Sequence, residues 1–333
     1  DELLEVLCDD AIGAPEVHAA VTRLLTRKEM MNDPKAISAV KAEADGLLSK
    51  RTWLLETVRE KADVAHEART AGQKSHFGHL MSICSEKHSE LAEWLRILKG
   101  RIVYRGDNAT DEYGAAAVYQ TLAANPTSIA GLNNNLAYGQ LPGHKTTCGD
   151  ATKAYIQSLL KSKAKTWVAL PPELWPKEWR GKYTKPVCVL ERSLYGHPEA
   201  GPHWERHFEA IVKGPEFNGS VVDGFPSNYT FKGKYAGLCL SVSVDDLNLS
   251  GPEALHEPFW AEMMKHVDID ETTEAGRILG RNHDTVNLNG VKGLAFNMQE
   301  YCESCCDLYE GLPGSAVETG CDSLLSGGLA HSF

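Results

Sequence analysis

An apolar run that delivers two adjacent carboxylates is the feature that most constrains this chain. Residues 238–249 read Leu-Cys-Leu-Ser-Val-Ser-Val-Asp-Asp-Leu-Asn-Leu, so Asp245 and Asp246 interrupt a β-prone stretch that resumes behind them. Adjacent charges within an apolar strand cost desolvation free energy unless a partner compensates them. A tight turn that exposes both acids lowers this cost, and a divalent cation would supply the opposite charge. A plain hairpin with an Asp-Asp turn fits the same pattern.

A third acid stands at the end of another extended segment. Residues 149–155 read Gly-Asp-Ala-Thr-Lys-Ala-Tyr, with Asp150 near the end of the extended part. Mg²⁺ prefers oxygen ligands and is commonly bound by one or two carboxylates together with substrate phosphates. Two such ions about 4 Å apart can activate an attacking hydroxyl and stabilise the leaving oxygen in phosphoryl transfer. We therefore expect Asp150 to meet Asp245 and Asp246 at one metal site.

The apolar periodicity predicts an irregular mixture of helices and strands. Asp33 and Pro34 have the residue types of an N-cap and a first helical position, and they open a helix with apolar residues at helical spacing up to Leu47. The further predicted helices are 86–99, 153–160, 199–213, 252–266 and 298–308. The predicted strands are 101–106, 147–152, 166–170, 186–190, 229–231 and 238–244. Because the strands and helices do not alternate regularly, the sequence predicts an α+β fold.

Charge is distributed unevenly along the chain. The net charge of −11 argues against a nucleic acid ligand when it is taken for the whole chain. Residues 150–192, however, contain nine Lys or Arg and four acids, which gives a local charge of +5, and they follow a basic cluster of Arg96, Lys99, Arg101 and Arg105. A run of this kind is either a solvated surface or a surface that contacts phosphates.

Cysteine usage and the ends of the chain bear on its location. The nine cysteines are scattered and odd in number, which favours reduced thiols over a secreted disulfide framework. Cys302, Cys305 and Cys306 lack the second pair that a structural zinc site needs, so we interpret them as ordinary thiols. No segment approaches the roughly 20 apolar residues of a membrane helix, and no signal pattern opens the chain. We expect an intracellular protein cut from a longer polypeptide.

The order of these motifs resembles the reverse transcriptase domain of copia-type retrotransposons. The similarity extends over about residues 22–310, and no single motif carries it alone. The matching motifs, in chain order, are Lys50-Arg-Thr-Trp53, Lys99-Gly-Arg-Ile-Val-Tyr-Arg-Gly106, Asp150-Ala-Thr-Lys-Ala-Tyr155, a Trp-bearing strand that ends in Leu170-Pro-Pro172, Ser193-Leu-Tyr-Gly196, a helix with Trp204, Val244-Asp-Asp246 and Ile278-Leu-Gly280.

This resemblance implies a right-hand polymerase fold of the α+β class, with fingers, a palm and a partial thumb. An antiparallel palm sheet would bear the catalytic aspartates. The implied organisation is a linker or N-terminal extension at 1–30, fingers with N-terminal helices at 31–145, a palm interleaved with the fingers at 146–250, a palm end and thumb-like connection at 251–311, and a flexible tail at 312–333.

The resemblance also assigns roles to individual residues. The catalytic and metal-binding positions, for Mg²⁺ with Mn²⁺ as the alternative, are Asp150, Asp245 and Asp246, with the carbonyl of Ala151 as a further metal ligand. Tyr155 falls where relatives exclude the sugar 2′-hydroxyl, although a core aromatic fits this position equally well. The other nucleotide-binding positions are Lys99, Arg101, Arg105 and Glu199. The primer-contacting positions are Ser243, Leu279 and Gly280.

The function that the resemblance implies is RNA-directed DNA polymerisation. Its partners would be an RNA template, a DNA primer strand and dNTP, with RNase H and integrase regions elsewhere in a parent polyprotein and no membrane. The implied location is a cytoplasmic virus-like particle, with a nuclear stage as an option. Trp204 is expected to pack in the core.

Two departures from the family pattern leave other functions open. Ser243 stands where the family has an aromatic residue, and Glu199 and Pro202 stand where it has Gln and Arg. They fit a catalytically decayed remnant or a nucleic-acid-binding scaffold. A metal-dependent phosphoesterase that uses the same acids is a third hypothesis. The sequence has neither the Gly-x-Ser-x-Gly motif of a hydrolase nor a Walker-type phosphate loop.

Overall fold

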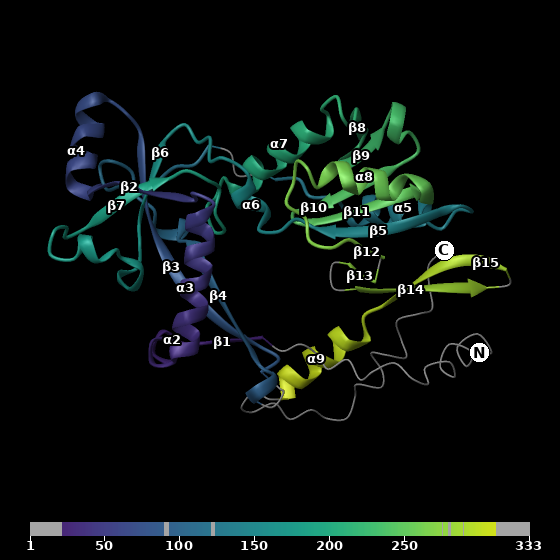
Figure 1. The fold of residues 1–333 in the computed structure, drawn as a ribbon, viewed down its shortest axis with the longest axis horizontal. Helices are drawn as coiled ribbons and strands as arrows, with labels where there is room; N and C mark the ends of the chain where they lie inside the picture. The colour runs from purple at the N-terminus through teal and green to yellow at the C-terminus, as the bar shows by residue number, and fades with distance from the viewer. Residues whose placement is uncertain are drawn as a thin grey trace.

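Two six-stranded sheets organise the chain, which passes from one to the other more than once (Figure 1). The computed structural model describes residues 22–89, 93–120, 124–274, 276–278, 281–288 and 290–310. The first sheet has the order β1-β3-β6-β7-β2, with β4 paired to β3. Its strands are β1 (Thr22–Leu24), β2 (Trp53–Glu60), β3 (Ser75–Lys87), β4 (Ile97–Tyr104), β6 (Lys165–Ala169) and β7 (Pro186–Leu190).

The second sheet is antiparallel and has the order β12-β5-β11-β10-β9-β8. Its strands are β5 (His144–Asp150), β8 (Gly219–Val222), β9 (Phe225–Phe231), β10 (Cys239–Ser243), β11 (Asp246–Pro252) and β12 (Thr273–Glu274). A third, three-stranded sheet consists of β13 (Arg277–Ile278), β14 (Arg281–Leu288) and β15 (Val291–Asn297).

Helices cover both large sheets. The helices are α2 (Arg27–Asn32), α3 (Pro34–Ser49), α4 (Lys61–Ala71), α5 (Ile129–Tyr138), α6 (Ala154–Gln157), α7 (Ala200–Val212), α8 (His256–Met263) and α9 (Gln299–Glu310). Short 3₁₀ turns occur at Glu93–Leu95, Gly106–Asn108, Pro172–Leu174, Lys177–Trp179, Gly233–Tyr235 and Glu253–Leu255. None of the helices within the described ranges has both the length and the apolar character to cross a bilayer.

Helix α3 confirms its predicted start and packs closely on the first sheet. The Asp33 side chain accepts a hydrogen bond from the Lys35 N–H at 2.8 Å, and Pro34 occupies the first turn. The helix approaches β4 at Gly100, where a Cβ atom would lie 2.5 Å from the Ala39 carbonyl oxygen. Only glycine permits this contact, because any side chain at position 100 would collide with the backbone of α3.

The core of the second sheet lies between its strands and two helices. Trp204 and Phe208 of α7 and Phe259 of α8 are buried against Leu240 and Leu247 of the sheet. Helix α5 packs in a separate cluster, in which Leu132 and Leu136 contact Cys148 and Ile278. Because side chains alternate along a strand, this division places α7 and α8 on one face of the sheet and α5 on the other.

Several predicted boundaries are wrong. The stretch 86–99 is not a helix: β3 continues to Lys87, and β4 begins at Ile97. Trp94, which had suggested an apolar helix face, is 81% exposed, so this face has no core to pack against. Helix α6 is shorter than predicted, since its N-cap, Lys153, has a positive φ of 52° and the helix ends at Gln157.

The predicted division into segments also needs correction. Residues 22–30 are not a linker, because β1 pairs with β3 and α2 begins with a capping box between Thr26 and Glu29. Helix α5, placed in the predicted segment 31–145, packs on the second sheet. In chain order, β6 and β7 of the first sheet lie between β5 and β8 of the second sheet. The predicted tail at 312–333 and residues 1–21 lie outside the described residues.

Candidate active site

A two-residue turn joins β10 to β11 and carries the acidic pair. Ser243 pairs with Asp246 at the end of the hairpin, so Val244 and Asp245 form the turn itself. Val244 has a φ of +59°, in the left-handed region. Tight hairpin turns favour glycine at a first position with positive φ, and a β-branched residue is strained there. Such strain costs on the order of 1–3 kcal/mol and persists only where neighbouring contacts impose it.

The third acid lies directly across the sheet from this turn. Asp150 is the last residue of β5 and is the antiparallel partner of Asp246 on β11. The N–H of buried Ala151 donates to the Asp245 carbonyl oxygen at 2.8 Å, which fixes the turn against the end of β5. The structure therefore brings together the three predicted catalytic aspartates. Like charges directly opposite each other in a sheet are destabilising, so this arrangement needs a compensating group.

The pKa values of these acids report that repulsion. Partial burial, followed by the charges of Asp245 and Asp150, raises the pKa of Asp246 to about 6. Burial, Asp245 and Asp270 raise the pKa of Asp150, and the nearby Lys99 ammonium lowers it. A divalent cation would remove the repulsion that these shifts express.

The donor set suits a hard cation that is bound jointly with a substrate. Within the ranges that the structure describes, no three His, Cys, Asp or Glu side chains are arranged to hold a metal ion by themselves. Mg²⁺ usually takes only one or two protein carboxylates and completes its octahedral shell with phosphate oxygens and water. Asp150 and Asp246, with Asp245 beside them, therefore fit Mg²⁺ or Mn²⁺ as a partner of a phosphate-bearing substrate.

Basic side chains of β4 lie on the side of the aspartates. Along β4, Gly100 and Ile102 are buried and Lys99 and Arg101 are exposed, as the alternation of a strand requires. Lys99 is close enough to influence the pKa of Asp150, and Arg101 likewise lowers the pKa of Tyr195. Of the predicted nucleotide-binding residues, Lys99 thus lies within electrostatic reach of Asp150, and Arg101 lies within reach of Tyr195.

Arg105 is engaged elsewhere. The Arg105 guanidinium binds the Asp107 carboxylate at 2.7 Å, and the main-chain N–H of Arg105 donates to the His79 carbonyl oxygen at 2.9 Å. Both ion-pair partners are exposed, so the pair itself adds little stability. The structure does not place Arg105 with Lys99 and Arg101.

Two tyrosines stand beside the acids. The rings of Tyr155 and Tyr195 pack edge to face with centroids 4.8 Å apart. Burial and the charge of Asp245 raise the pKa of Tyr155, and burial, Asp245, Tyr155 and Asp150 raise the pKa of Tyr195 to about 12. The sequence pointed to Tyr155 and missed Tyr195, although Tyr195 belongs to an unchanged family motif.

The backbone around Tyr195 fixes its position. Its carbonyl oxygen accepts the Tyr104 N–H at 2.7 Å, which attaches the loop to the end of β4. Gly196 follows at a φ of +85°, and a Cβ atom there would lie 2.1 Å from the Tyr104 carbonyl oxygen. Only glycine fits so close an approach, so the loop that carries Tyr195 depends on it.

Glu199 lies in a different environment from the aspartates. It is buried, with 6% of its surface exposed, and its carboxylate accepts hydrogen bonds from the Ser162 hydroxyl and, at 3.3 Å, from the Gln120 N–H. His76 and His203 are close enough for the charge of Glu199 to raise their pKa values against the larger opposing effect of burial. This placement gives no support to the predicted nucleotide contact of Glu199.

The predicted primer contacts are only partly described. Ser243 is half-buried at the base of the hairpin turn, paired with Asp246. Leu279 and Gly280 lie outside the described residues. Ala151, predicted as a metal ligand, is fully buried and holds the turn through its N–H.

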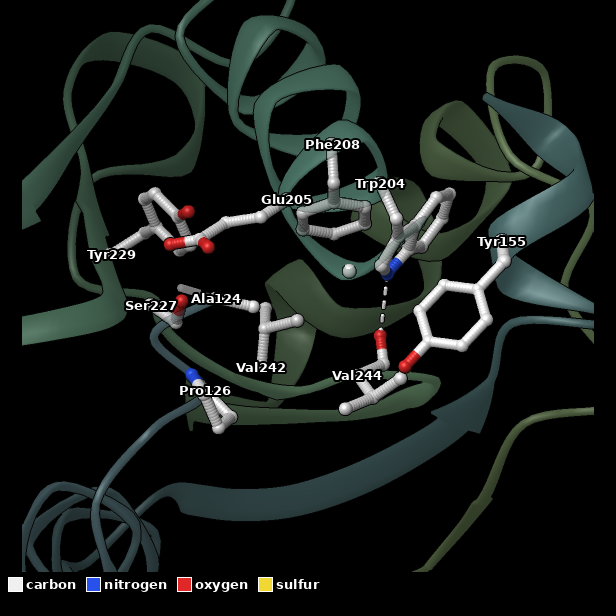
Figure 2. Close-up of a pocket in the computed structure, with 11 residues that line it drawn as sticks. Ala124, Pro126, Tyr155, Trp204, Glu205, Phe208, Ser227, Tyr229, Val242 and Val244 are labelled. Atoms are coloured by element: carbon white, nitrogen blue, oxygen red, sulfur yellow. Dashed lines mark hydrogen bonds between the residues drawn. The ribbon is translucent and has the colours of Figure 1, made fainter. Parts of the chain in front are cut away.

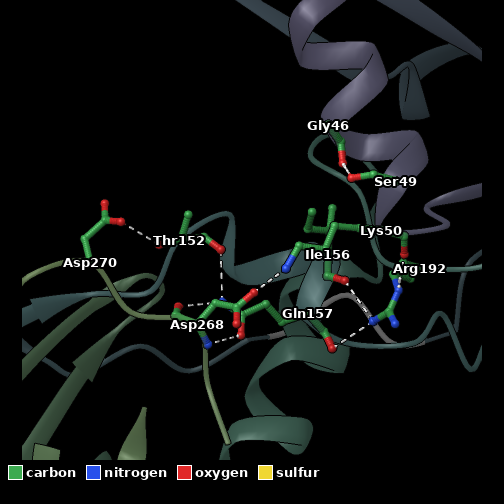
Figure 3. Close-up of polar contacts among 9 residues, drawn as sticks. All are labelled: Gly46, Ser49, Lys50, Thr152, Ile156, Gln157, Arg192, Asp268 and Asp270. Atoms are coloured by element: carbon green, nitrogen blue, oxygen red, sulfur yellow. Dashed lines mark hydrogen bonds and ion pairs between the residues drawn. The ribbon is translucent and has the colours of Figure 1, made fainter. Parts of the chain in front are cut away.

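Asp270 is a fourth acid near the site, and sequence reasoning missed it. Its N–H donates to the Asp150 carbonyl oxygen at 2.9 Å, and its carboxylate accepts the Thr152 hydroxyl at 2.8 Å (Figure 3). The pairing joins residues 118 positions apart, so no local pattern reveals it. Asp270 adds negative charge beside Asp150.

A set of polar contacts, which we call the joint, connects the end of α3 to α6 and to the segment after α8 (Figure 3). Lys50 forms an ion pair with Asp268. The Arg192 guanidinium donates to the Lys50 carbonyl oxygen at 2.7 Å and to the Ile156 and Gln157 carbonyl oxygens at 3.1 and 3.2 Å. One arginine thus caps the end of α6 and holds the end of α3 beside it.

Comparison with known proteins adds no identification. No protein-family model matches the chain, and no curated protein matches it.

Proposed function

We propose that the chain is the polymerase core of a copia-type reverse transcriptase, an RNA-directed DNA polymerase with a right-hand fold. In this proposal the first sheet belongs to the fingers and the second sheet is the palm. The interleaved connection of the two sheets supports this interpretation, as does an antiparallel sheet with acids at one end. The resemblance of the ordered sequence motifs supports it independently.

One observation carries the proposal. Asp150 and Asp246 are direct cross-strand partners, Asp245 occupies the adjoining turn, Lys99 lies within electrostatic reach of Asp150, and Arg101 lies within reach of Tyr195. Acids that face one another and basic residues opposite them suit a ligand that is both cationic and anionic. A metal-bound triphosphate has both charges.

Each residue has a role in nucleotidyl transfer. The chemistry that Mg²⁺ or Mn²⁺ supplies at such a site is activation of an attacking hydroxyl and stabilisation of a leaving oxygen. Asp150 and Asp246 would hold the metal ion, with Asp245 beside them. Lys99 and Arg101 would neutralise charge that develops on the triphosphate. Tyr155, held by the edge of Tyr195, would lie against the sugar and disfavour a 2′-hydroxyl.

The partners follow from the reaction. The template would be RNA and the primer DNA, both held mainly through phosphate contacts, so their binding should weaken steeply with salt. RNase H and integrase regions would belong to the parent polyprotein. We place the reaction in a cytoplasmic virus-like particle, with a nuclear stage as an option.

Primer extension tests the proposal. The substrate is poly-rA with oligo-dT, in Mg²⁺ and in Mn²⁺, and the variants are D245N and D246N. Both should lower incorporation by at least about a hundredfold, because each removes charge that positions the reacting groups. Asp63, exposed in the first turn of α4, provides the control D63N, which should extend like the wild type. Extension that survives in D246N would contradict the proposal.

A catalytically decayed remnant is the second candidate. Ser243 at the hairpin and the buried position of Glu199 favour it, because neither offers the contact that the family pattern expects. A folded chain that binds the primer–template duplex and incorporates no nucleotide would identify it. Incorporation that D245N abolishes would exclude it.

A further inference from the structure

Trp204 makes a contact that core packing does not require. The side chain is buried, with 2% of its surface exposed, on the face of α7 that covers the second sheet. Its indole N–H donates to the Val244 carbonyl oxygen at 2.6 Å, so it reaches the turn that carries Asp245 (Figure 2). An indole is a donor only, and here its single donor is directed at the main chain of the acidic turn.

The turn depends on contacts from outside the hairpin. Val244 has a positive φ, which a β-branched residue adopts only under constraint. Both carbonyl groups of the turn are held by N–H donors: Val244 by Trp204 at 2.6 Å and Asp245 by Ala151 at 2.8 Å. These donors come from α7 and from the end of β5. The turn is thus fixed from two elements that the hairpin does not contain.

The surroundings of this hydrogen bond are apolar. A cavity of about 40 Å³ lies beside the indole, and the residues that line it include Val242, Val244, Phe208 and Tyr155 (Figure 2). Without the indole donor, the Val244 carbonyl oxygen would lose the hydrogen bond that it receives from α7. An unsatisfied buried acceptor is unfavourable, and it would add to the strain already present at Val244. The expected response is a change in the turn.

We infer that Trp204 is a positioning residue: its N–H holds the strained Val244 turn so that Asp245 and Asp246 stay in register with Asp150. Trp204 touches neither substrate nor metal in this assignment. It acts through the backbone of the turn. The inference rests on the proposed function for the identity of the metal. It deepens that function by naming the residue that orients the metal ligands.

The test compares two buried tryptophans of the helices that cover the second sheet, Trp204 of α7 and Trp260 of α8. W204F removes the donor and keeps an aromatic ring. The matched control is W260F, because Trp260 is 4% exposed and its indole N–H donates at 2.8 Å to the Thr147 hydroxyl, away from the turn. The readouts are Mn²⁺ affinity by electron paramagnetic resonance of the purified chain, and kcat and KM in primer extension.

W204F should bind Mn²⁺ about tenfold more weakly and lower kcat by about tenfold, the effect of one lost hydrogen bond at the turn. The KM for primer–template should stay unchanged. W260F should retain wild-type Mn²⁺ affinity and kcat. Because Phe is smaller than Trp, benzothienylalanine at position 204 provides a second variant: it has the shape of Trp without the N–H, and it replaces W204F if that chain does not fold.

A rescue separates positioning from packing. V244G adopts a positive φ without steric strain, so the turn needs the indole less. The loss caused by W204F should therefore be smaller in the V244G background, whereas a purely structural loss would be the same in both. Equal effects of W204F and W260F on Mn²⁺ affinity would overturn the Trp204 assignment alone. A wild-type chain that neither binds Mn²⁺ nor extends a primer would overturn the proposed function and the assignment together.

Discussion

Two groups of acids in this chain lie in opposite environments. The aspartates at the end of the second sheet face one another, and partial burial, followed by their repulsion, raises the pKa values of Asp150 and Asp246. Glu199 is more deeply buried, yet its carboxylate accepts hydrogen bonds from Ser162 and from the Gln120 N–H. The comparison teaches that burial alone does not identify a functional acid. An acid whose charge has no internal compensation needs a ligand, and a fully hydrogen-bonded acid serves the fold.

The strongest test of this comparison is D150N. Removing the charge should lower primer extension by at least about a hundredfold. The same change should raise the melting temperature in metal-free buffer, because the repulsion between Asp150 and its neighbours destabilises the folded state. Activity and stability are measured on the same preparation by primer extension and calorimetry. A D150N chain that is both active and less stable would break the comparison.

E199A should have the reverse pattern. The Ser162 hydroxyl and the Gln120 N–H would lose their acceptor, so the free energy of unfolding should fall by about 1–3 kcal/mol. The KM for dNTP should not change, since the Glu199 carboxylate is buried and bonded to Ser162 and Gln120. Urea denaturation and steady-state kinetics measure the two effects. The control is E205A in α7, because the Glu205 carboxylate accepts the Asn125 N–H at 3.0 Å. A raised KM for dNTP in E199A would restore the nucleotide contact that the sequence predicted.

A smaller effect concerns pH and the histidines around Glu199. Burial lowers the pKa of His197 to about 3, against the opposing charge of Glu199 and with small contributions from His203 and His76. The unfolded chain therefore binds a proton near pH 6.5 and the folded chain does not, so stability falls as the pH drops from about 6.5 toward 3.

H197F should reduce that fall, by at most about 1.4 kcal/mol per pH unit. Unfolding in urea at pH 7 and at pH 5 measures the difference between the variant and the wild type. Equal pH dependence in the two chains would show that His197 does not titrate as its environment implies.

Local patterns predicted much of the fold. The strand 186–190 and the helix from Pro34 are confirmed because proline, capping residues and apolar periodicity act over a few residues. A hairpin turn at the acids is also found, but it consists of Val244 and Asp245, one residue before the predicted Asp245–Asp246. The helix predicted at 86–99 failed because apolar spacing does not reveal whether a core exists to receive it, and Trp94 is exposed.

The site was only partly predictable. The three aspartates follow from strand ends, and the structure brings them together. The neighbours that orient them come from distant segments: Trp204 is 40 positions from Val244, and Asp270 is 118 positions from Thr152. Contacts of this kind depend on how α7 and the segment after α8 pack, and no motif in the sequence encodes them.

The joint at the end of α3 has a consequence for solution behaviour. Its ion pair between Lys50 and Asp268 is more than half exposed on both sides, so salt should weaken it. The hydrogen bonds of Arg192 to three main-chain carbonyls are short-range contacts, which salt weakens less than it weakens the ion pair. The distance between β4 and the aspartates should therefore change little with ionic strength. If duplex binding falls steeply with salt, the cause would then be the release of counterions from the phosphates. A conformational change of the protein would not be needed to explain it.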